Sequence, residues 1–462
     1  MKVISKYLKK MSATTQILLS FIGVILIGTI LLSLPISNKQ YSIGFLNNLF
    51  IATSATCVTG LTPVSIAEVY TLFGQIVILI MIQIGGLGFI TLFMFFLTTV
   101  KNRISMRNKN LVAESLSIES NFDITKMIRS ILLYTFIFEG IGAALLAIRF
   151  IPLFGVVKGI FSAIFISISS FCNAGFDNLG NNSLMNYAID PIINITIMLL
   201  IIIGGIGFTV WFEVESKIKA ILNKEISIQK AIKKANLHTR VVVLSSVILL
   251  LAGAILTLVF EWNNSATIGD LKLFDKIMAA LFTSTTLRTA GFSTIDFSLL
   301  RPSLQFVMLL FMLTGGSPGG TAGGIKTTTL VAIIFASMAY LKGNKDIRVH
   351  NRKLGEEILR RAIAVSAMAI SILFVAIIIL LSSESSLEPM EVIFEAVSAF
   401  ATVGLSLNAT ARLTSIGKII VIILMYCGRV GVLTLGITFM NRGHDAHVEN
   451  EIQYPEENIL IG

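Results

Sequence analysis

The sequence predicts an all-α membrane protein with eight transmembrane helices in four parallel repeats. Three observations predict this fold class: a composition too apolar for a water-facing surface, eight long apolar runs, and glycine motifs that recur in register. Hydrophobic residues make up 55% of the 462 residues, charged residues only 13%, and the mean hydropathy is +0.85. Soluble domains carry about 25% charged residues. The composition therefore excludes an ordinary soluble enzyme, a disordered chain and a small disulfide-stapled domain.

Eight apolar runs are long enough to be interpreted as membrane spans, because about 20 residues at 1.5 Å each cross a hydrocarbon core of about 30 Å. The first run follows four lysines and has no small-residue cleavage site, so we interpret it as a retained span and not as a signal peptide. The predicted spans cover residues 15–35, 70–99, 127–150, 189–214, 239–260, 303–340, 360–382 and 415–440.

The basic residues predict the orientation. Lys and Arg number four before the first span, six in 101–129, seven in 217–240 and seven in 342–361. Basic loops stay on the cytoplasmic side. We therefore expect a multi-pass protein of the plasma membrane with both termini in the cytoplasm. The net charge of +10 is explained by this topology and does not indicate nucleic-acid binding. The basic inner loops fit either anionic lipid or a protein partner.

Each outer segment contains a second apolar run of about 12 residues, which as a helix reaches only about 18 Å and is too short to cross. These runs cover 44–55, 158–171, 273–285 and 390–400. Because each ends in small and polar residues, we expect re-entrant half-helices. They end at Gly60, Gly175, Gly291 and Gly404, which are spaced by 115, 116 and 113 residues.

A second glycine set follows each of these four glycines by 24 to 29 residues. Any single glycine is explained by close packing of membrane helices, but eight in register indicate a membrane–pore–membrane unit repeated four times around one central pore. Two crossings per unit make the repeats parallel, unlike inverted-repeat transporters. The second set begins at Gly85, Gly204, Gly315 and Gly428. The predicted units are 1–100, 101–216, 217–345 and 346–441, followed by a cytoplasmic tail, 442–462.

The four turns predict a binding site for a monovalent cation. Non-helical backbone at membrane depth is tolerated only where it is buried or lines a water-filled cavity, and rings of carbonyls there replace the hydration shell of an ion. The side chains before the glycines differ while the glycines do not, so backbone oxygens are the expected ligands, without the carboxylates that calcium prefers. The candidate filter residues are Val58, Thr59, Gly60, Asn173, Ala174, Gly175, Thr289, Ala290, Gly291, Thr402, Val403 and Gly404.

The sixth apolar run should be broken. Its 38 residues would make a helix of about 57 Å, nearly twice the thickness of the membrane core. Six glycines and a proline in its centre oppose a helix, which indicates either a packing kink or, because ten residues are involved, an intramembrane gate beneath the filter. A phosphate-binding loop is excluded, since Ile325 separates Gly324 from Lys326. The candidate gate comprises Gly315, Gly316, Ser317, Pro318, Gly319, Gly320, Thr321, Ala322, Gly323 and Gly324.

Three basic side chains lie at membrane depth. Arg429 is near the middle of the last span, where inserting a charge into the membrane costs about 3 kcal/mol. It either pairs with Glu139 or lines the pore. Its position in the glycine motif of the fourth unit favours the pore wall, as part of the gate. Arg288 either orients the third turn or extends outward, and we favour a structural role. Lys326 is expected to reach the cytoplasmic interface.

These motifs resemble the Trk/Ktr/HKT superfamily of potassium transporters over nearly the whole chain. The resemblance rests on the glycine-centred turns, on Asn173-Ala174-Gly175-Phe176 and Arg288-Thr289-Ala290-Gly291-Phe292, and on the glycine loop from Gly316 to Thr327. Eight spans with no additional N-terminal pair resemble the bacterial Ktr membrane subunit more than the longer Trk subunit.

The resemblance implies potassium uptake, often sodium-dependent, by a homodimer on a cytosolic ring of nucleotide-binding (RCK/KTN-type) regulatory subunits. It implies K⁺ as the transported ion, Na⁺ as an activator or coupling ion, and no covalent cofactor. Gly60 stands where sodium-preferring members tend to carry serine, which favours potassium. Two alternatives are a sodium-selective or sodium/potassium cotransporter of the same architecture and an enzyme or pump subunit. The last would need a nucleotide motif, paired carboxylates or a histidine cluster, and the sequence contains none, so we do not expect an enzyme.

Overall fold

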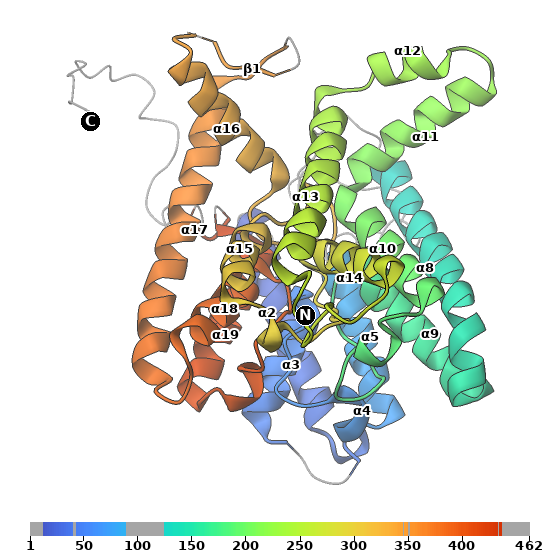
Figure 1. Cartoon of the computed structure of the whole chain (residues 1–462), viewed down its shortest axis with the longest axis vertical. Coiled ribbons are helices and arrows are strands. Elements are labelled where there is room, and N and C mark those ends of the chain that lie inside the picture. Colours follow the sequence, from blue (N-terminus) through green and yellow to red (C-terminus); the bar gives the residue numbers. More distant parts are fainter. Residues whose placement is uncertain are drawn as a thin grey trace, which may run out of the picture.

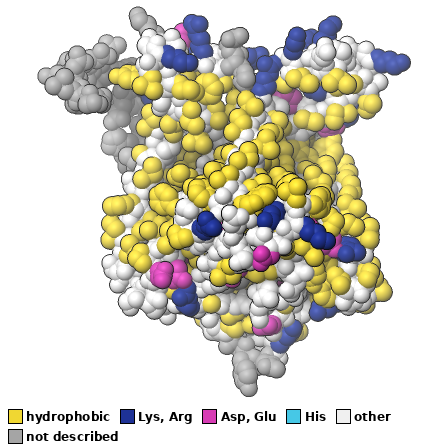
Figure 2. Space-filling view, in the orientation of Figure 1, with side chains coloured by type: hydrophobic (Ala, Val, Ile, Leu, Met, Phe, Trp, Pro, Cys, Tyr) yellow, Lys and Arg dark blue, Asp and Glu magenta, His cyan; other side chains and the backbone are white. Residues whose placement is uncertain are grey.

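The computed structural model describes residues 13–39, 43–88, 124–344, 346–349, 352–432 and 434–436, and it is built almost entirely from helices (Figure 1). In the described part of the chain the one sheet is a hairpin, in which β1 (Arg348–Val349) pairs antiparallel with β2 (Arg352–Lys353). Hydrophobic side chains cover much of the visible flank (Figure 2). The ends of the predicted spans 70–99 and 415–440 and the tail 442–462 lie partly or wholly outside the described residues.

Four long helices match predicted spans. They are α2 (Ala13–Ser33), α8 (Ile124–Phe154), α13 (Leu237–Glu261) and α17 (Glu356–Ser383). Each of them is long and apolar enough to cross a membrane, and each exposes large apolar side chains on its surface. In water such a surface would be unfavourable, whereas lipid tails are as apolar as these side chains. The prediction of a long apolar helix is therefore confirmed in these four places.

A short helix follows each long one and packs against it. The short helices are α3 (Phe45–Cys57), α9 (Val156–Phe171), α14 (Leu273–Thr286) and α18 (Pro389–Ala401). Their 13 to 16 residues are too few to cross. The last two turns of each are buried, although these helices contain serine and threonine, which places their C-terminal ends at the centre of the molecule.

The first helix in the second apolar run of each unit ends before the run does, which the sequence predicts only for the third unit. These helices are α5 (Leu72–Leu87), α10 (Pro191–Ile206), α15 (Pro302–Leu313) and α19 (Ser415–Val430). Three of them end at a glycine with positive φ, namely Gly88 (81°), Gly207 (100°) and Gly431 (91°). A residue with positive φ ends an α-helix, and glycine adopts it at no steric cost.

The prediction that 189–214 forms one continuous span is wrong. After Gly207 the chain turns by 99° into α11 (Phe208–Leu222). In the sixth run the predicted break is present, because α15 ends at Leu313 and α16 begins only at Thr327 and continues to Leu341. Of the described helices, four are long enough to cross alone, or five if α10 and α11 count as one span. The remaining elements are α4 (Ile66–Val69), α12 (Ile228–Lys233), η1 (Pro35–Ser37), η2 (Met185–Tyr187), η3 (Phe297–Leu299) and η4 (Thr410–Arg412).

Glycines of the second set let the second helix of a unit cross the end of its short helix. A Cβ added to Gly85, Gly204 or Gly428 would collide with a backbone carbonyl oxygen, that of Thr56, Phe171 or Phe400 respectively. Each of these carbonyls belongs to the residue four positions before the first-set glycine. The second glycine set therefore has a packing role that repeats in three of the four units.

We expect Gly204→Ala to destabilise the protein, because the added methyl group has no room beside the Phe171 carbonyl and overpacking costs about 1–3 kcal/mol. Gly140→Ala in α8 is the matched control, since nothing lies within 4 Å of its added Cβ. The control should retain or raise stability, because alanine favours a helix over glycine by about 1 kcal/mol. Gel filtration of the detergent-purified variants after heating measures how much folded protein remains. An equal loss of folded protein in both variants would contradict the close approach of Gly204 to the Phe171 carbonyl.

Candidate functional site

Each short helix leads into a turn with two residues at positive φ. The first is Val58, Asn173, Thr289 or Thr402, with φ between 52° and 63°. The second is the first-set glycine, Gly60, Gly175, Gly291 or Gly404, with φ between 68° and 99°. Positive φ in a β-branched residue is unfavourable by about 1–3 kcal/mol and persists only where the surroundings impose it. The same turn therefore forms four times, and in three of the four a β-branched residue is held in this unfavourable conformation.

Hydrogen bonds to the short helix explain how the turn is imposed. In units one, two and four, the amide before the glycine donates to the carbonyl of a serine five residues earlier, at 2.7–2.8 Å; these serines are Ser54, Ser169 and Ser398. The hydroxyl groups of Ser54 and Ser398 also accept from the amides of Gly60 and Gly404, both at 3.1 Å. The third unit differs, because Ala290 N donates to Thr286 O at 3.0 Å. The turn amides are thus bonded backward to the helix.

The four turns meet in a ring. A Cβ on Gly60 would lie 2.7 Å from the carbonyl oxygen of Ala174, one on Gly175 would lie 2.7 Å from that of Ala290, and one on Gly291 would lie 2.7 Å from that of Val403. A Cβ on Gly404 would lie closer still to the carbonyl oxygen of Thr59, which closes the circle. We call this arrangement the glycine ring. Only a residue without a side chain allows a neighbouring backbone this close.

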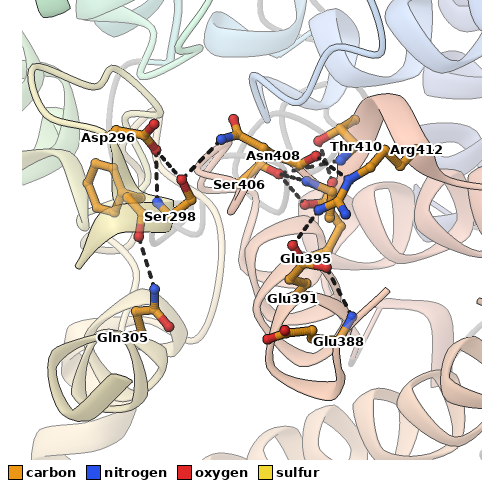
Figure 3. A network of polar contacts seen from close by, with 12 residues as sticks. Asp296, Ser298, Gln305, Glu388, Glu391, Glu395, Ser406, Asn408, Thr410 and Arg412 are labelled. Carbon is orange, nitrogen blue, oxygen red and sulfur yellow. Dashed lines mark hydrogen bonds and ion pairs between the residues drawn. The ribbon is translucent and has the colours of Figure 1, made fainter. Parts of the chain in front are cut away.

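A cavity of about 450 Å³ opens on one side of the glycine ring. The four ring glycines line it together with two carboxylates, Asp177 and Asp296. Polar contacts hold its wall between the third and fourth units (Figure 3). Asp296 Oδ1 accepts from the Ser298 hydroxyl at 2.6 Å, and Asn408 Nδ2 donates to the same hydroxyl at 3.2 Å. The wall is thus crosslinked by side chains from both units.

The fourth short helix places a buried carboxylate behind this wall, where it bonds two of the residues that line the cavity. Glu395 accepts hydrogen bonds from the hydroxyl groups of Ser406, at 2.7 Å, and Thr410, at 2.5 Å, so both of its oxygens are bonded (Figure 3). Beside it, Arg412 pairs with Glu391 and donates to Asn408 O at 3.1 Å. These contacts hold the loop after Gly404 against the helix that precedes it.

Asp177 is the titratable group of the cavity wall with a perturbed pKa. Desolvation raises the pKa of its carboxyl to about 6, and hydrogen bonds from the Leu179 amide, the Ser183 hydroxyl and the Gly180 amide offset part of that effect. Desolvation disfavours the charged form, whereas hydrogen bonds to a carboxylate favour it. Asp177 is therefore ionised at neutral pH and becomes protonated near pH 6, where an ordinary aspartate remains charged.

On the other side of the glycine ring lies the loop 315–324. It docks on the end of α10 through backbone hydrogen bonds: Ser317 N donates to Gly205 O at 3.1 Å, Thr321 N to Gly204 O at 3.2 Å, and Phe208 N to Gly319 O at 3.0 Å. Backbone groups at the break in the second unit therefore hydrogen-bond to backbone groups at the break in the third unit. These hydrogen bonds satisfy backbone groups of both breaks that have no partner within a helix, and an apolar environment requires that such groups be satisfied.

Asn173 connects the loop 315–324 to the glycine ring. Its Oδ1 accepts from the Thr321 hydroxyl at 3.2 Å, and its Nδ2 donates to the Arg288 carbonyl at 3.2 Å. A Cβ added to Gly323 would also collide with the Thr402 side chain. The Asn173 side chain therefore has a specific role in packing, in addition to the backbone that the four turns share. An asparagine at a buried turn was the available signal, but its partners lie more than 100 residues away.

Arg429 contacts backbone and not a carboxylate. Its guanidinium donates to the carbonyl of Thr321 in the loop and to those of Gly85, at 2.5 Å, and Gly86, at 3.3 Å. Glu139 instead accepts from Gln83 Nε2 at 3.0 Å. Of the two alternatives for Arg429, the structure therefore supports the position beside the loop, where the charge bonds the first unit to the third.

The other two basic side chains also donate to partners inside the protein. Lys326 turns back onto the loop and donates to Ala322 O at 2.7 Å, so the prediction that it extends to the cytoplasmic interface is wrong. Arg288 is buried and donates to Ser246 Oγ of α13 at 3.0 Å, so it neither extends outward nor donates to turn carbonyls through its side chain. Its contact joins the turn after α14 to α13, which is a structural role.

Comparisons with known proteins agree on one family. The family described as TrkH, cation transport protein, matches residues 4–448. The chain is 36% identical to the Ktr system potassium uptake protein B of Bacillus subtilis, over 96% of this chain and 95% of that protein. It is also 36% identical to the potassium/sodium uptake protein NtpJ of Enterococcus hirae, over 98% of each. The crystal structure of the potassium transporter TrkH from Vibrio parahaemolyticus shares the fold, with a TM-score of 0.69 over 90% of this chain and 84% of that one, at 20% identity.

Proposed function

Because this chain belongs to the TrkH family of cation transport proteins, we propose that it takes up potassium across the plasma membrane through the glycine ring. The observation that carries the proposal is the closed circle of four glycines, each against the carbonyl oxygen of the next turn. With the turn amides bonded backward to the short helices, the carbonyl oxygens are the groups available to a dehydrated ion.

Electrostatics favour a cation at this position. The C-terminal ends of the four short helices point toward the glycine ring, and each carries about half a negative charge. The twelve residues of the four turns contain no carboxylate, which suits a monovalent ion more than calcium. Asp177 and Asp296 in the cavity attract cations to its entrance. A membrane potential then supplies about 2.3 kcal/mol per charge per 100 mV for uptake.

We propose that the loop 315–324 with Arg429 is the gate. The loop lies against Thr402 and hydrogen-bonds to Asn173, so it occupies the path on the far side of the glycine ring. Arg429 stabilises this position by donating to the Thr321 carbonyl, and its charge opposes a cation that leaves the ring. Opening requires that these bonds break, and each bond to a charged group contributes about 1.5–3 kcal/mol.

We also propose that the chain functions as the membrane subunit of a Ktr-type system. The relative from Bacillus subtilis is named as part of such a system. On this proposal the four units 1–100, 101–216, 217–345 and 346–441 surround one pore, both termini are cytoplasmic, and the chain forms a homodimer on a cytosolic nucleotide-binding ring. No covalent cofactor takes part in this mechanism.

Flux measurements distinguish between potassium and sodium as the transported ion. The second candidate, sodium or combined sodium/potassium transport, is favoured by the similarity to a potassium/sodium uptake protein. Purified chain in liposomes, without nucleotide, should take up ⁸⁶Rb⁺ under an inside-negative potential, with potassium competing better than sodium. Better competition by sodium would establish the second candidate, and silence without an energy source would contradict both.

Replacing Gly60 with Ser should reduce the preference for potassium over sodium, because the new Cβ lies 2.7 Å from the Ala174 carbonyl oxygen and displaces a ligand. Gly180→Ser is the matched control. Gly180 also has positive φ and lines the same cavity, yet nothing lies within 4 Å of its added Cβ. Competition assays with rubidium measure both variants, and an unchanged preference in Gly60→Ser would exclude the ring as the filter.

Replacing Arg429 with Ala should raise unregulated flux about tenfold or more, because the closed loop loses bonds to a charged group. Arg149→Ala removes an equal charge from an exposed pair with Asp190 and should leave flux unchanged. Rubidium uptake by reconstituted chain without any regulatory subunit gives the comparison. If both variants conduct like the parent while selectivity is intact, Arg429 is not part of a gate.

Uptake at subsaturating potassium should fall as the external pH decreases from 7 to 5, with a midpoint near 6. In this window the raised pKa of Asp177, about 6, removes a negative charge from the cavity that an ordinary aspartate would keep. One charge near the ion in a water-filled cavity contributes about 1 kcal/mol, or about fivefold in local concentration. Asp177→Asn should show the reduced rate already at pH 7 and no further decrease. A parallel decrease in the variant would assign the pH effect to another group.

A further inference from the structure

The segment that follows the bend at Gly207 has an apolar face that no described element covers. We call α11, α12 and the turn between them the arm, residues 208–233. The arm begins where α10 ends and projects from the body beyond α8 and α13 (Figure 1). On α11 the exposed apolar residues are Val214, Ile218 and Leu222, with 43%, 50% and 74% of their surface accessible. Spaced by four residues, they fall on one side of the helix.

Lysines border this apolar stripe on both sides. At 100° per residue, Lys217 and Lys219 lie about 100° to either side of Ile218, and on one side Lys219 pairs with Glu215. Lys224 follows in the turn, and Lys230 and Lys233 lie on α12, whose Ile228 and Ile232 are 64% and 67% exposed. Figure 2 shows Lys and Arg side chains along the outer edge of this projection and hydrophobic side chains below them.

The opposite face of α11 is held by the body of the protein. Glu213 accepts from Asn236 N at 2.7 Å and from the Thr239 hydroxyl at 2.5 Å, at the start of α13. At the root of the arm, Trp211 packs edge-on against Phe138 of α8, with ring centroids 4.5 Å apart, and donates to Ile203 O at 3.1 Å. The direction of the arm is therefore fixed, and the apolar stripe cannot rotate inward.

We propose that the arm lies on the cytoplasmic leaflet, with its apolar stripe in the membrane interface and its lysines on anionic lipid headgroups. Lipid is the occupant that fits three observations. The arm starts at the end of a helix in an apolar bundle and bends by 99° from that helix. It carries five lysines against three glutamates, of which Glu213 and Glu215 are already bonded to the start of α13 and to Lys219. Apolar stripes bordered by lysine are typical of helices that lie in the interface, and anionic headgroups attract clustered lysines.

The test places a fluorophore on each face of α11. In the full-length chain, Ile218→Cys and the matched control Ser216→Cys, about 160° away on the helix, are labelled with an environment-sensitive dye. Cys57 and Cys172 are fully buried and Cys427 is half-buried, so labelling of the parent chain measures the background. Proteoliposomes contain phosphatidylcholine alone or with phosphatidylglycerol, each with spin-labelled lipid as quencher. We expect several-fold stronger quenching at position 218 than at 216, and a further increase with phosphatidylglycerol.

Charge variants test the role of the lysines. Lys217→Gln combined with Lys219→Gln should abolish the increase caused by phosphatidylglycerol, whereas Lys342→Gln combined with Lys353→Gln, two exposed lysines outside the arm, should leave it intact. Equal, weak quenching at 216 and 218 in both lipid mixtures would overturn the proposal, because the arm would then lie in water. Energy transfer between labelled copies, independent of lipid composition, would overturn it in favour of a second copy as the occupant. These readouts need no ion flux, so they are independent of the proposed transport function.

Discussion

The structure depends on one constraint: every peptide group inside an apolar bundle must be hydrogen-bonded or offered to an ion or water. The four turns satisfy this constraint differently for their amides and for their carbonyl groups. Their amides donate back to the short helices, and their carbonyl oxygens lie against the glycine of the neighbouring turn. This division requires positive φ at two residues of each turn, separated by one residue, and the absence of a side chain at the second. The short helices, and the glycines that let α5, α10 and α19 cross them, serve to bring the four turns together.

The same constraint explains why the breaks in α10 and in the third unit occur together. The chain leaves the helix at Gly207 and at Leu313, and the backbone groups released at these two places bond to each other. Thr321 lies at the centre of this contact. Its amide bonds the end of α10, its hydroxyl bonds Asn173 at the glycine ring, and its carbonyl accepts from Arg429. A displacement of the loop therefore changes contacts in the other three units, and the arm is attached to the same contact through Phe208.

Much of the site could be predicted from the order of residues alone, because it repeats. The spacing of Gly60, Gly175, Gly291 and Gly404 identified the turns, and six glycines with a proline identified the broken run. The partners of single polar side chains could not be predicted in this way. Arg429 donates to Gly85, 344 residues away, and Lys326 turns back onto its own loop. Such pairings depend on which units are neighbours in space, and the sequence does not contain that order.

The sequence by itself determined the membrane class, the four long helices and the glycine positions where the chain must bend, because hydropathy and the lack of a Cβ act locally. Only the tertiary structure decided where the shorter helices end. Residues 189–214 are mostly apolar, and hydropathy does not show that the helix ends at Gly207. The backbone groups released at this end bond to the loop 315–324, which lies more than 100 residues further along the chain. The link from Asn173 to Arg288 and Thr321 was decided in the same way, since hydrogen bonds between units exist only after the units have packed.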